Sequence, residues 1–76
     1  MDFGEALRIV KDGGRVRRAL WEELGGRAGS WLELMPTDQV GEVLACAVTE
    51  PDGGTAMVLF ACSQWDLLAE DWKRAP

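Results

Sequence analysis

Two apolar runs separated by a turn constrain the fold of this chain more than any other feature. Residues 44–48 and 56–61 are apolar throughout, and residues 50–54 between them read Glu-Pro-Asp-Gly-Gly, a composition that favours a tight turn. The pattern predicts an antiparallel hairpin of strands 42–49 and 55–61. Neither strand alternates apolar and polar residues as a strand with one solvated face does, so both faces of the hairpin need cover.

The chain is short for a fold that must cover both faces of a hairpin. It has 76 residues, which we interpret as one domain spanning residues 1–76, and a domain of this size is marginally stable alone. It contains no histidine, so Cys46 and Cys62 have too few companions for a zinc site. With no secretory leader before them, both are expected to be reduced, packed thiols of a cytoplasmic protein. A second copy is then the economical cover, which predicts a homo-oligomer, either a dimer or a tetramer.

An amphipathic helix is predicted at the N-terminus. Asp2 and Glu5 have the spacing of a capping box, and the glycines at residues 13–14 can end the helix in a left-handed conformation. Helical spacing places four apolar side chains on one buried stripe, namely Phe3, Ala6, Leu7 and Val10. This helix can cover one face of the hairpin, which leaves the other face for a second copy.

Further elements are expected from residue type. They are a basic strand at residues 15–20, a glycine-rich loop at 22–30 that can begin with a helical turn at 21–24, a strand at 31–35 closed by Pro36, and a final strand near 72–74. Ser63 opens a short second helix, with Asp66 three residues later to complete its cap. The predicted fold is therefore α+β: an N-terminal helix packed on a small antiparallel sheet, with a short second helix before a C-terminal strand.

The composition excludes several classes of function. The net charge of −5 disfavours binding to DNA or RNA polymers, because such binding depends on neutralising many phosphates. No apolar run approaches the length of a membrane span. The sequence has no Gly-x-Ser-x-Gly elbow and no Walker loop, and neither cysteine has a histidine to activate it. We therefore expect no catalysis, no cofactor and no metal.

Four tryptophans and a cluster of arginines predict a ligand-binding site. Indoles stack on nucleobases or anchor interfaces, and four are more than one small core needs. Trp21 follows the basic strand, so it could stack on a base while Arg17 or Arg18 makes a bidentate contact to a phosphate. A solvated strand face is the alternative for the arginines. Trp72 reads as a core or interface residue, and two roles stay open, those of Trp31 and Trp65.

The segment 63–72 gathers amide, carboxylate and indole groups. Such a mixture can hydrogen-bond a polar aromatic ligand, and the candidate contacts are Ser63, Gln64, Asp66 and Asp71. The structural alternative is a capped helix that sends its leucines, Leu67 and Leu68, into the core and has one anchoring tryptophan.

Two motifs carry a resemblance to a known family. Residues 1–7 read Met-Asp-Phe-Gly-Glu-Ala-Leu, and residues 63–72 read Ser-Gln-Trp-Asp-Leu-Leu-Ala-Glu-Asp-Trp. They resemble the M-x-F-G-E-A-L and S-Q-x-D-x-L-A-x-D-W motifs of small phage proteins, the second type of Thoeris anti-defence protein. The resemblance reaches both ends of the chain, and the middle matches loosely.

The resemblance implies both an assembly and an activity. Members are α+β homotetramers with pockets between subunits. They sequester, without cleaving it, a cyclic ADP-ribose isomer that a Toll/interleukin-receptor-like enzyme makes on infection, and some bind cyclic dinucleotides. The positions of this chain that match the family are Arg18, Trp21, Ser63, Gln64, Asp66, Asp71 and Trp72.

The sequence departs from the family pattern around Trp21. Relatives have a glycine before it and an asparagine-glycine turn after it, whereas here an alanine-leucine pair precedes it and Glu22 and Glu23 follow. Carboxylates beside a phosphate site repel the ligand unless they point away.

The prediction is a cytoplasmic oligomer that sequesters a cyclic nucleotide-derived signal. The alternatives are a protein-interaction module of phage or prophage origin, and a hydrolase of the same signal that uses Asp66 and Asp71 with a metal.

Overall fold

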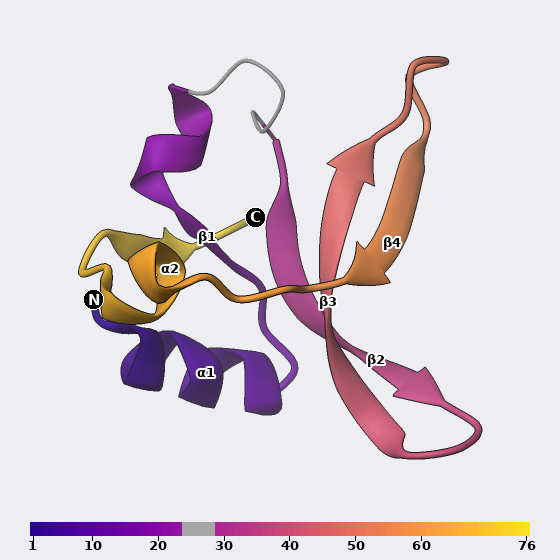
Figure 1. Cartoon of the computed structure of the whole chain (residues 1–76), viewed down its shortest axis with the longest axis horizontal. Coiled ribbons are helices and arrows are strands. Elements are labelled where there is room, and N and C mark those ends of the chain that lie inside the picture. Colours follow the sequence, from indigo (N-terminus) through magenta and orange to yellow (C-terminus); the bar gives the residue numbers. More distant parts are fainter. Residues whose placement is uncertain (24–28) are drawn as a thin grey trace.

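The computed structural model of the chain describes residues 1–23 and 29–76. Its elements, in chain order, are α1 (Phe3–Lys11), β1 (Val16–Arg18), the 3-10 turn η1 (Ala19–Glu22), β2 (Trp31–Thr37), β3 (Gly41–Thr49), β4 (Thr55–Leu59), α2 (Gln64–Leu68) and β5 (Trp72–Arg74). The strands form one antiparallel sheet in the order β4-β3-β2-β1-β5 (Figure 1). The predicted α+β arrangement is confirmed. Within the described residues, no helix has the length and hydropathy to cross a bilayer.

α1 begins and ends where the sequence predicts. The Asp2 carboxylate accepts a hydrogen bond from the backbone N–H of Glu5 at 2.9 Å, and the helix is followed by Gly13, whose φ of 92° suits glycine. Ala6 and Val10 are buried against the sheet. Phe3 and Leu7 were predicted to be buried with them and are only half-buried. The buried stripe is centred on Ala6 and Val10, so Leu7 lies on one edge of it.

The core lies between α1 and the end of the sheet formed by β5, β1 and β2. Val16 of β1 and Leu32 of β2 point from the sheet into this core together with Cys46 of the neighbouring strand β3, and Trp21 and Trp72 also belong to the cluster. The two cysteines differ from the prediction in one respect. Within the described residues neither cysteine forms a disulfide, and Cys46 is buried as expected, but Cys62 is exposed.

The basic strand is shorter than predicted. The backbone N–H of Ala19 still donates to the carbonyl of Asp71 in register with β5, but that of Leu20 donates to the Asp71 carboxylate, each at 3.0 Å, so the strand ends here. The chain then turns into η1, earlier than the helical turn expected at residues 21–24. Most of the predicted loop, residues 24–28, lies outside the described residues.

β2 runs through the proline that was expected to close it. Pro36 pairs with Glu42 of β3, and the strand continues to Thr37. Among the described residues, β2 pairs on its other side with β1 only at Leu32, so the N–H group that Pro36 lacks is not missed in that ladder.

The predicted hairpin is confirmed as β3 and β4. Its turn closes with a hydrogen bond from Glu50 N to the Gly54 carbonyl at 2.8 Å, and Gly53 has a φ of 90°. β4 ends at Leu59, two residues before the predicted boundary, and the chain then leaves the sheet toward α2.

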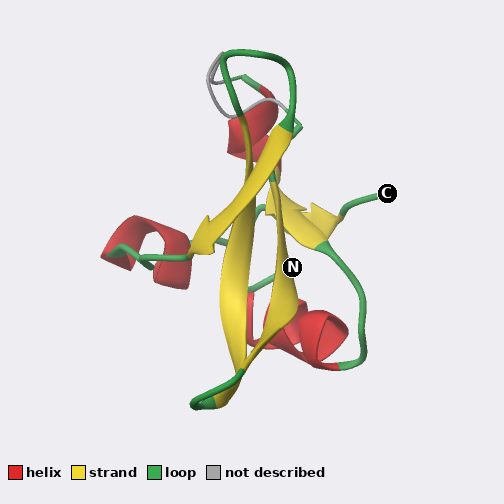
Figure 2. Ribbon diagram, turned by 90° about the vertical axis from the view of Figure 1, so that its right-hand side faces the viewer, coloured by secondary structure: helices red, strands yellow, loops and turns green. Residues whose placement is uncertain are grey.

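The hairpin lies at the end of the sheet away from the helices. α1 was expected to cover it, but its close contacts are with β5, β2, β1 and α2. Figure 2, viewed from the hairpin side, shows the hairpin strands in front of the helices. On β4, Val58 is 45% exposed and Leu59 is 71% exposed. The need for cover inferred from the sequence therefore remains at this end of the subunit.

Candidate functional site

The C-terminal motif builds α2 from its own cap. The hydroxyl of Ser63 accepts a hydrogen bond from the backbone N–H of Asp66 at 3.3 Å and donates one to the Asp66 carboxylate at 3.1 Å. This satisfies an N–H group at the start of the helix and fixes the Asp66 side chain in the same step. The predicted cap is confirmed.

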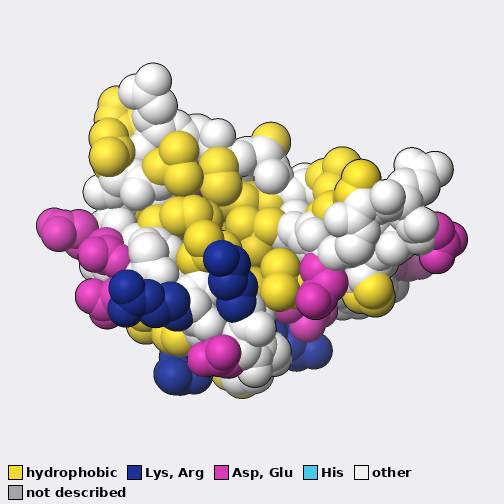
Figure 3. All heavy atoms as spheres, turned by 90° about the horizontal axis from the view of Figure 1, so that it is seen from below, with side chains coloured by type: hydrophobic (Ala, Val, Ile, Leu, Met, Phe, Trp, Pro, Cys, Tyr) yellow, Lys and Arg dark blue, Asp and Glu magenta, His cyan; other side chains and the backbone are white. Residues whose placement is uncertain are grey.

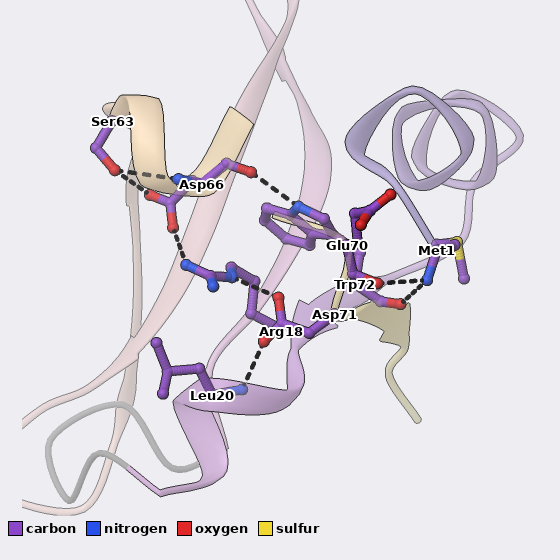
Figure 4. Close-up of polar contacts among 8 residues, drawn as sticks. All are labelled: Met1, Arg18, Leu20, Ser63, Asp66, Glu70, Asp71 and Trp72. Atoms are coloured by element: carbon purple, nitrogen blue, oxygen red, sulfur yellow. Dashed lines mark hydrogen bonds and ion pairs between the residues drawn. The ribbon is translucent and has the colours of Figure 1, made fainter. Parts of the chain in front are cut away.

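Arg18 links α2 to the sheet and to η1. Its Nη1 atom lies 3.0 Å from Asp66 Oδ1 and its Nε atom lies 2.8 Å from Asp71 Oδ1 (Figure 4). The arginine side chain is only 12% exposed. We call Arg18, Asp66 and Asp71 the Arg18 network. The Nε and Nη1 atoms of the guanidinium are thus engaged within the subunit, where they join α2 to the segment before β5.

Two members of the network, Arg18 and Asp71, have pKa values shifted toward their charged forms. Burial tends to raise the pKa of Asp71, but hydrogen bonds from Arg18 and from the backbone N–H of Leu20 outweigh it and lower this pKa below its usual range. Burial tends to lower the pKa of Arg18, and the hydrogen bonds and charges of Asp71 and Asp66 outweigh it and raise this pKa. A group with a lowered pKa is poorly suited to donate a proton at neutral pH.

Trp72 holds the carboxyl end of α2. Its indole N–H donates to the carbonyl of Asp66 at 2.9 Å, and the side chain is 1% exposed (Figure 4). The backbone carbonyls of Glu70 and Trp72 accept hydrogen bonds from the amino group of Met1. The motif thus attaches α2 to the core at Asp66 and at Trp72, which confirms the interpretation of Trp72 as a core residue.

Trp21 lies inside the aromatic core. Its ring meets those of Trp72 and Phe60 edge-on, with centroids 5.5 Å and 6.2 Å away, and the residue is 2% exposed. A continued strand would place Trp21 on the same face as Arg17, because strand residues alternate. The turn into η1 breaks that period and directs the indole inward, so its position gives no support to the predicted stacking on a ligand.

Arg17 points to the opposite face of the sheet from Arg18. Its Nη2 atom lies 2.7 Å from Glu22 Oε1, and Lys73 also contacts that oxygen. The hydrogen bond from Lys73, aided by the charges of Lys73 and Arg17, lowers the pKa of Glu22. Glu22 therefore pairs with cations of its own subunit, while Glu23 is exposed.

A cavity of about 440 Å³ lies against α2. It is lined by Ser63, Gln64, Trp65, Leu68 and Ala69. Trp65 is 82% exposed and Leu68 is 80% exposed, and no residue of α2 is buried. The alternative in which the leucines of this helix enter the core is therefore wrong. We call this surface the α2 site.

The α2 site unites only part of the predicted set. Ser63 and Gln64 line it, whereas Arg18, Asp66 and Asp71 form the network behind it, Trp21 is in the core and Arg17 is on the other face. Trp65 and Leu68 were not selected as ligand residues. Their spacing of three on a capped helix does place them on one side, and that signal could have found them.

The α2 site combines an apolar wall with a few polar groups. An indole and a leucine can hold a flat ring, and the amide of Gln64 both donates and accepts hydrogen bonds. Within residues 1–23 and 29–76, no group of three or more histidine, cysteine, aspartate or glutamate side chains could hold a metal ion. The arrangement is suited to binding.

Comparison with known proteins gives a family. No curated protein matches the chain significantly. The model of the Tad2-like family, described as the Thoeris anti-defense 2-like domain, matches residues 1–74, which include the Arg18 network and the α2 site. This match confirms the resemblance carried by the two terminal motifs. The chain therefore belongs to the Tad2-like family of Thoeris anti-defense domains.

Proposed function

We propose that this protein binds and sequesters a cyclic nucleotide-derived immune signal in the cytoplasm of an infected bacterium. The signal is a cyclic ADP-ribose isomer or a cyclic oligonucleotide. The observation that carries the proposal is the α2 site, a cavity of about 440 Å³ with an exposed indole beside an amide and a hydroxyl. Pockets for small molecules span about 300–1,000 Å³ and combine apolar walls with a few polar groups.

The proposed contacts come from α2. Trp65 stacks on a base, a contact that contributes about 1–3 kcal/mol. Gln64 hydrogen-bonds the edge of the base, and Ser63 lines the same cavity. The Arg18 network holds the helix in place and does not touch the ligand. Stacking is thereby assigned to Trp65 in place of Trp21.

We further propose that the signal is held without being cleaved. The hydroxyl of Ser63 is engaged by Asp66 as a cap, and the carboxylates of Asp66 and Asp71 are paired with Arg18. A hydrolase that used these two carboxylates with a metal would first have to displace the arginine from both. Binding alone requires no such rearrangement.

A second copy of the chain is proposed to complete the assembly. Residues 53–65 contain no charged side chain, and they include the whole of the outer strand β4 and its link to α2. In a chain of net charge −5, this is a surface where two copies can meet without opposing carboxylates. Figure 3 shows one face of the subunit, on which hydrophobic side chains gather in a hollow between two raised ends.

Ligand binding is tested by thermal shift and calorimetry with a panel of cyclic nucleotides. Ligand at a hundred times its dissociation constant should stabilise the fold by about 2.7 kcal/mol. Replacing Trp65 with alanine should weaken binding about tenfold or more, on the scale of a lost base stack. Val40→Ala is the matched control, because Val40 is also exposed, at 72%, and lies in the β2–β3 turn, outside the residues that line the α2 site. Equal affinity of both variants and the parent would reject the α2 site.

A second measurement separates sequestration from its rivals. Recovering the signal intact after heat denaturation supports sequestration, and recovering a linear product supports hydrolysis. The exposed Trp65 and Leu68 also suit a protein partner, as in the protein-interaction alternative. A stoichiometric protein complex that forms through Trp65, with no response to any nucleotide, would favour that alternative.

A further inference from the structure

The face of the sheet opposite the helices carries a group of polar side chains that is separate from the Arg18 network. Val16 pairs with Leu32, so the next step of the antiparallel ladder sets Arg17 opposite Trp31. Alternation directs both away from the core that holds Val16 and Leu32. Side chains opposite each other in this way have Cβ atoms about 5 Å apart. Arg17 also pairs with Lys73 of β5, which places a second cation beside it on the same face.

Arg17 and Trp31 each have a buried hydrogen-bond donor without an acceptor. Within the described residues, the buried side-chain polar atoms that lack a hydrogen-bond partner are Arg17 Nε and Trp31 Nε1. A buried donor left unpaired costs about 1–3 kcal/mol. Native proteins rarely leave such groups unsatisfied, and two on adjacent side chains indicate an acceptor that the subunit does not itself supply.

The surroundings favour an anion as that acceptor. Arg15, Arg17 and Lys73 contribute three positive charges here, against two negative charges from Glu22 and Glu33. The cluster is therefore locally positive in a chain whose net charge is −5.

The geometry around Trp31 selects a phosphate group over a base. The guanidinium carbon of Arg15 lies 4.5 Å from the centre of the Trp31 ring, so one face of this indole is already occupied. The indole N–H is the group of Trp31 that still lacks an acceptor. A guanidinium Nε–H beside an indole N–H matches the oxygens of a phosphate, which accept several charge-assisted hydrogen bonds at once.

We propose that Arg17 and Trp31 form a phosphate-binding site on the helix-free face of the sheet, separate from the α2 site. In this site the two unpaired donors bind one phosphate group, and Arg15 and Lys73 add positive charge around it. Glu22 is an internal competitor, because its carboxylate already occupies Nη2 of Arg17. The proposal does not depend on what the α2 site binds.

The site is tested with inorganic pyrophosphate as the probe. In nitrogen-15 spectra of the indole groups, the Trp31 N–H signal, assigned by its loss in Trp31→Phe, should shift saturably on titration. Arg17→Met should weaken binding about tenfold, and Trp31→Phe, which keeps an aromatic ring but removes the donor, should weaken it severalfold as followed by the amide signals of β1. Glu22→Gln should strengthen binding severalfold, because it removes the competing charge.

Two controls distinguish this site from general charge effects. Arg8→Gln removes the same charge from the exposed face of α1 and should leave binding unchanged. Trp65→Ala alters the α2 site and should also leave pyrophosphate binding unchanged. If Arg8→Gln weakens binding as much as Arg17→Met does, or if no signal shifts saturably, the site is overturned and its donors are satisfied by water. Trp31→Phe keeps the test valid if Arg17→Met fails to fold.

A second titration, with adenosine diphosphate, distinguishes a free phosphate ion from a phosphate carried on a nucleotide. If adenosine diphosphate binds no better than pyrophosphate, the site takes the free ion. If it binds at least tenfold more tightly, the site takes a phosphate carried on a nucleotide. Either outcome supports the site, and failure of both ligands to bind contradicts it.

Discussion

The two ends of the sheet have opposite characters. At the β5 end, α1 covers the strands, the Arg18 network pairs its charges, and Trp21 and Trp72 meet in the core. At the β4 end, the strands extend beyond the helices, and Val58 and Leu59 are exposed. The difference indicates that one end supplies the stability of the subunit and the other supplies surface for contact with something else.

The outer strands show the same contrast. β5 has three residues and carries Lys73 and Arg74, the kind of short, charged edge that resists pairing with another strand. β4 has five residues with no charge and no proline. An edge with none of these protections is expected to be paired in the assembled protein.

The largest predicted effect compares two tryptophans of one motif. Trp72→Ala should lower the free energy of unfolding by about 3–5 kcal/mol, because the indole is buried and also holds the Asp66 carbonyl. Trp65→Ala should change it by no more than about 0.5 kcal/mol, because that indole is exposed. Urea denaturation of both variants measures the difference. Similar losses in the two would mean that α2 packs against the core in solution.

This pair of tryptophans also illustrates what could be predicted from the sequence. The caps at Asp2 and Ser63, the hairpin turn and the order of elements all follow from local chemistry, and the structure confirms them. Whether the apolar side of α2 faces in or out depends on contacts that are remote in sequence. The helix carries Trp65, Leu67 and Leu68 in either case, so its periodicity could not decide.

The candidate site was harder to predict than the fold for a related reason. Arg18 and Trp21 have the chemistry of phosphate and base contacts, and both are used inside the subunit. The backbone turn that directs Trp21 inward is set by Asp71, about fifty residues away in sequence. No local pattern near Trp21 contains that information.

The next predicted effect compares two arginine pairs. Arg18→Met should destabilise the subunit by about 2–3 kcal/mol, because it leaves two partly buried carboxylates without their partner. Arg15→Met should cost well under about 1 kcal/mol, because the pair of Arg15 with Glu33 is solvated. Thermal and urea denaturation would measure both. Equal losses would contradict the structural role of the Arg18 network.

A smaller effect is expected from pH. The pKa of Asp71 is lower in the folded chain than its ordinary value of about 3.9, so its contribution to stability is fully present above that value. This contribution should disappear as the pH falls from about 4 through the lower folded-state pKa. In Arg18→Met the main cause of the lowering is removed, so this part of the acid dependence should shrink. The free energy of unfolding as a function of pH, measured for both proteins, checks the prediction.

The smallest effect on the subunit is expected at the β4 edge, where the effect on assembly should be large. Leu59→Lys introduces a charge on a side chain that is 71% exposed, so the stability of the isolated subunit should change by no more than about 0.5 kcal/mol. The same charge at an unprotected edge opposes its own copy across a twofold axis, so the oligomer should dissociate. Val40→Lys, at a side chain that is 72% exposed in the β2–β3 turn, should leave assembly intact. Light scattering measures the mass of each variant in solution. A parent protein that is monomeric at micromolar concentration would refute the proposed assembly, and an unchanged mass in Leu59→Lys would move the interface away from β4.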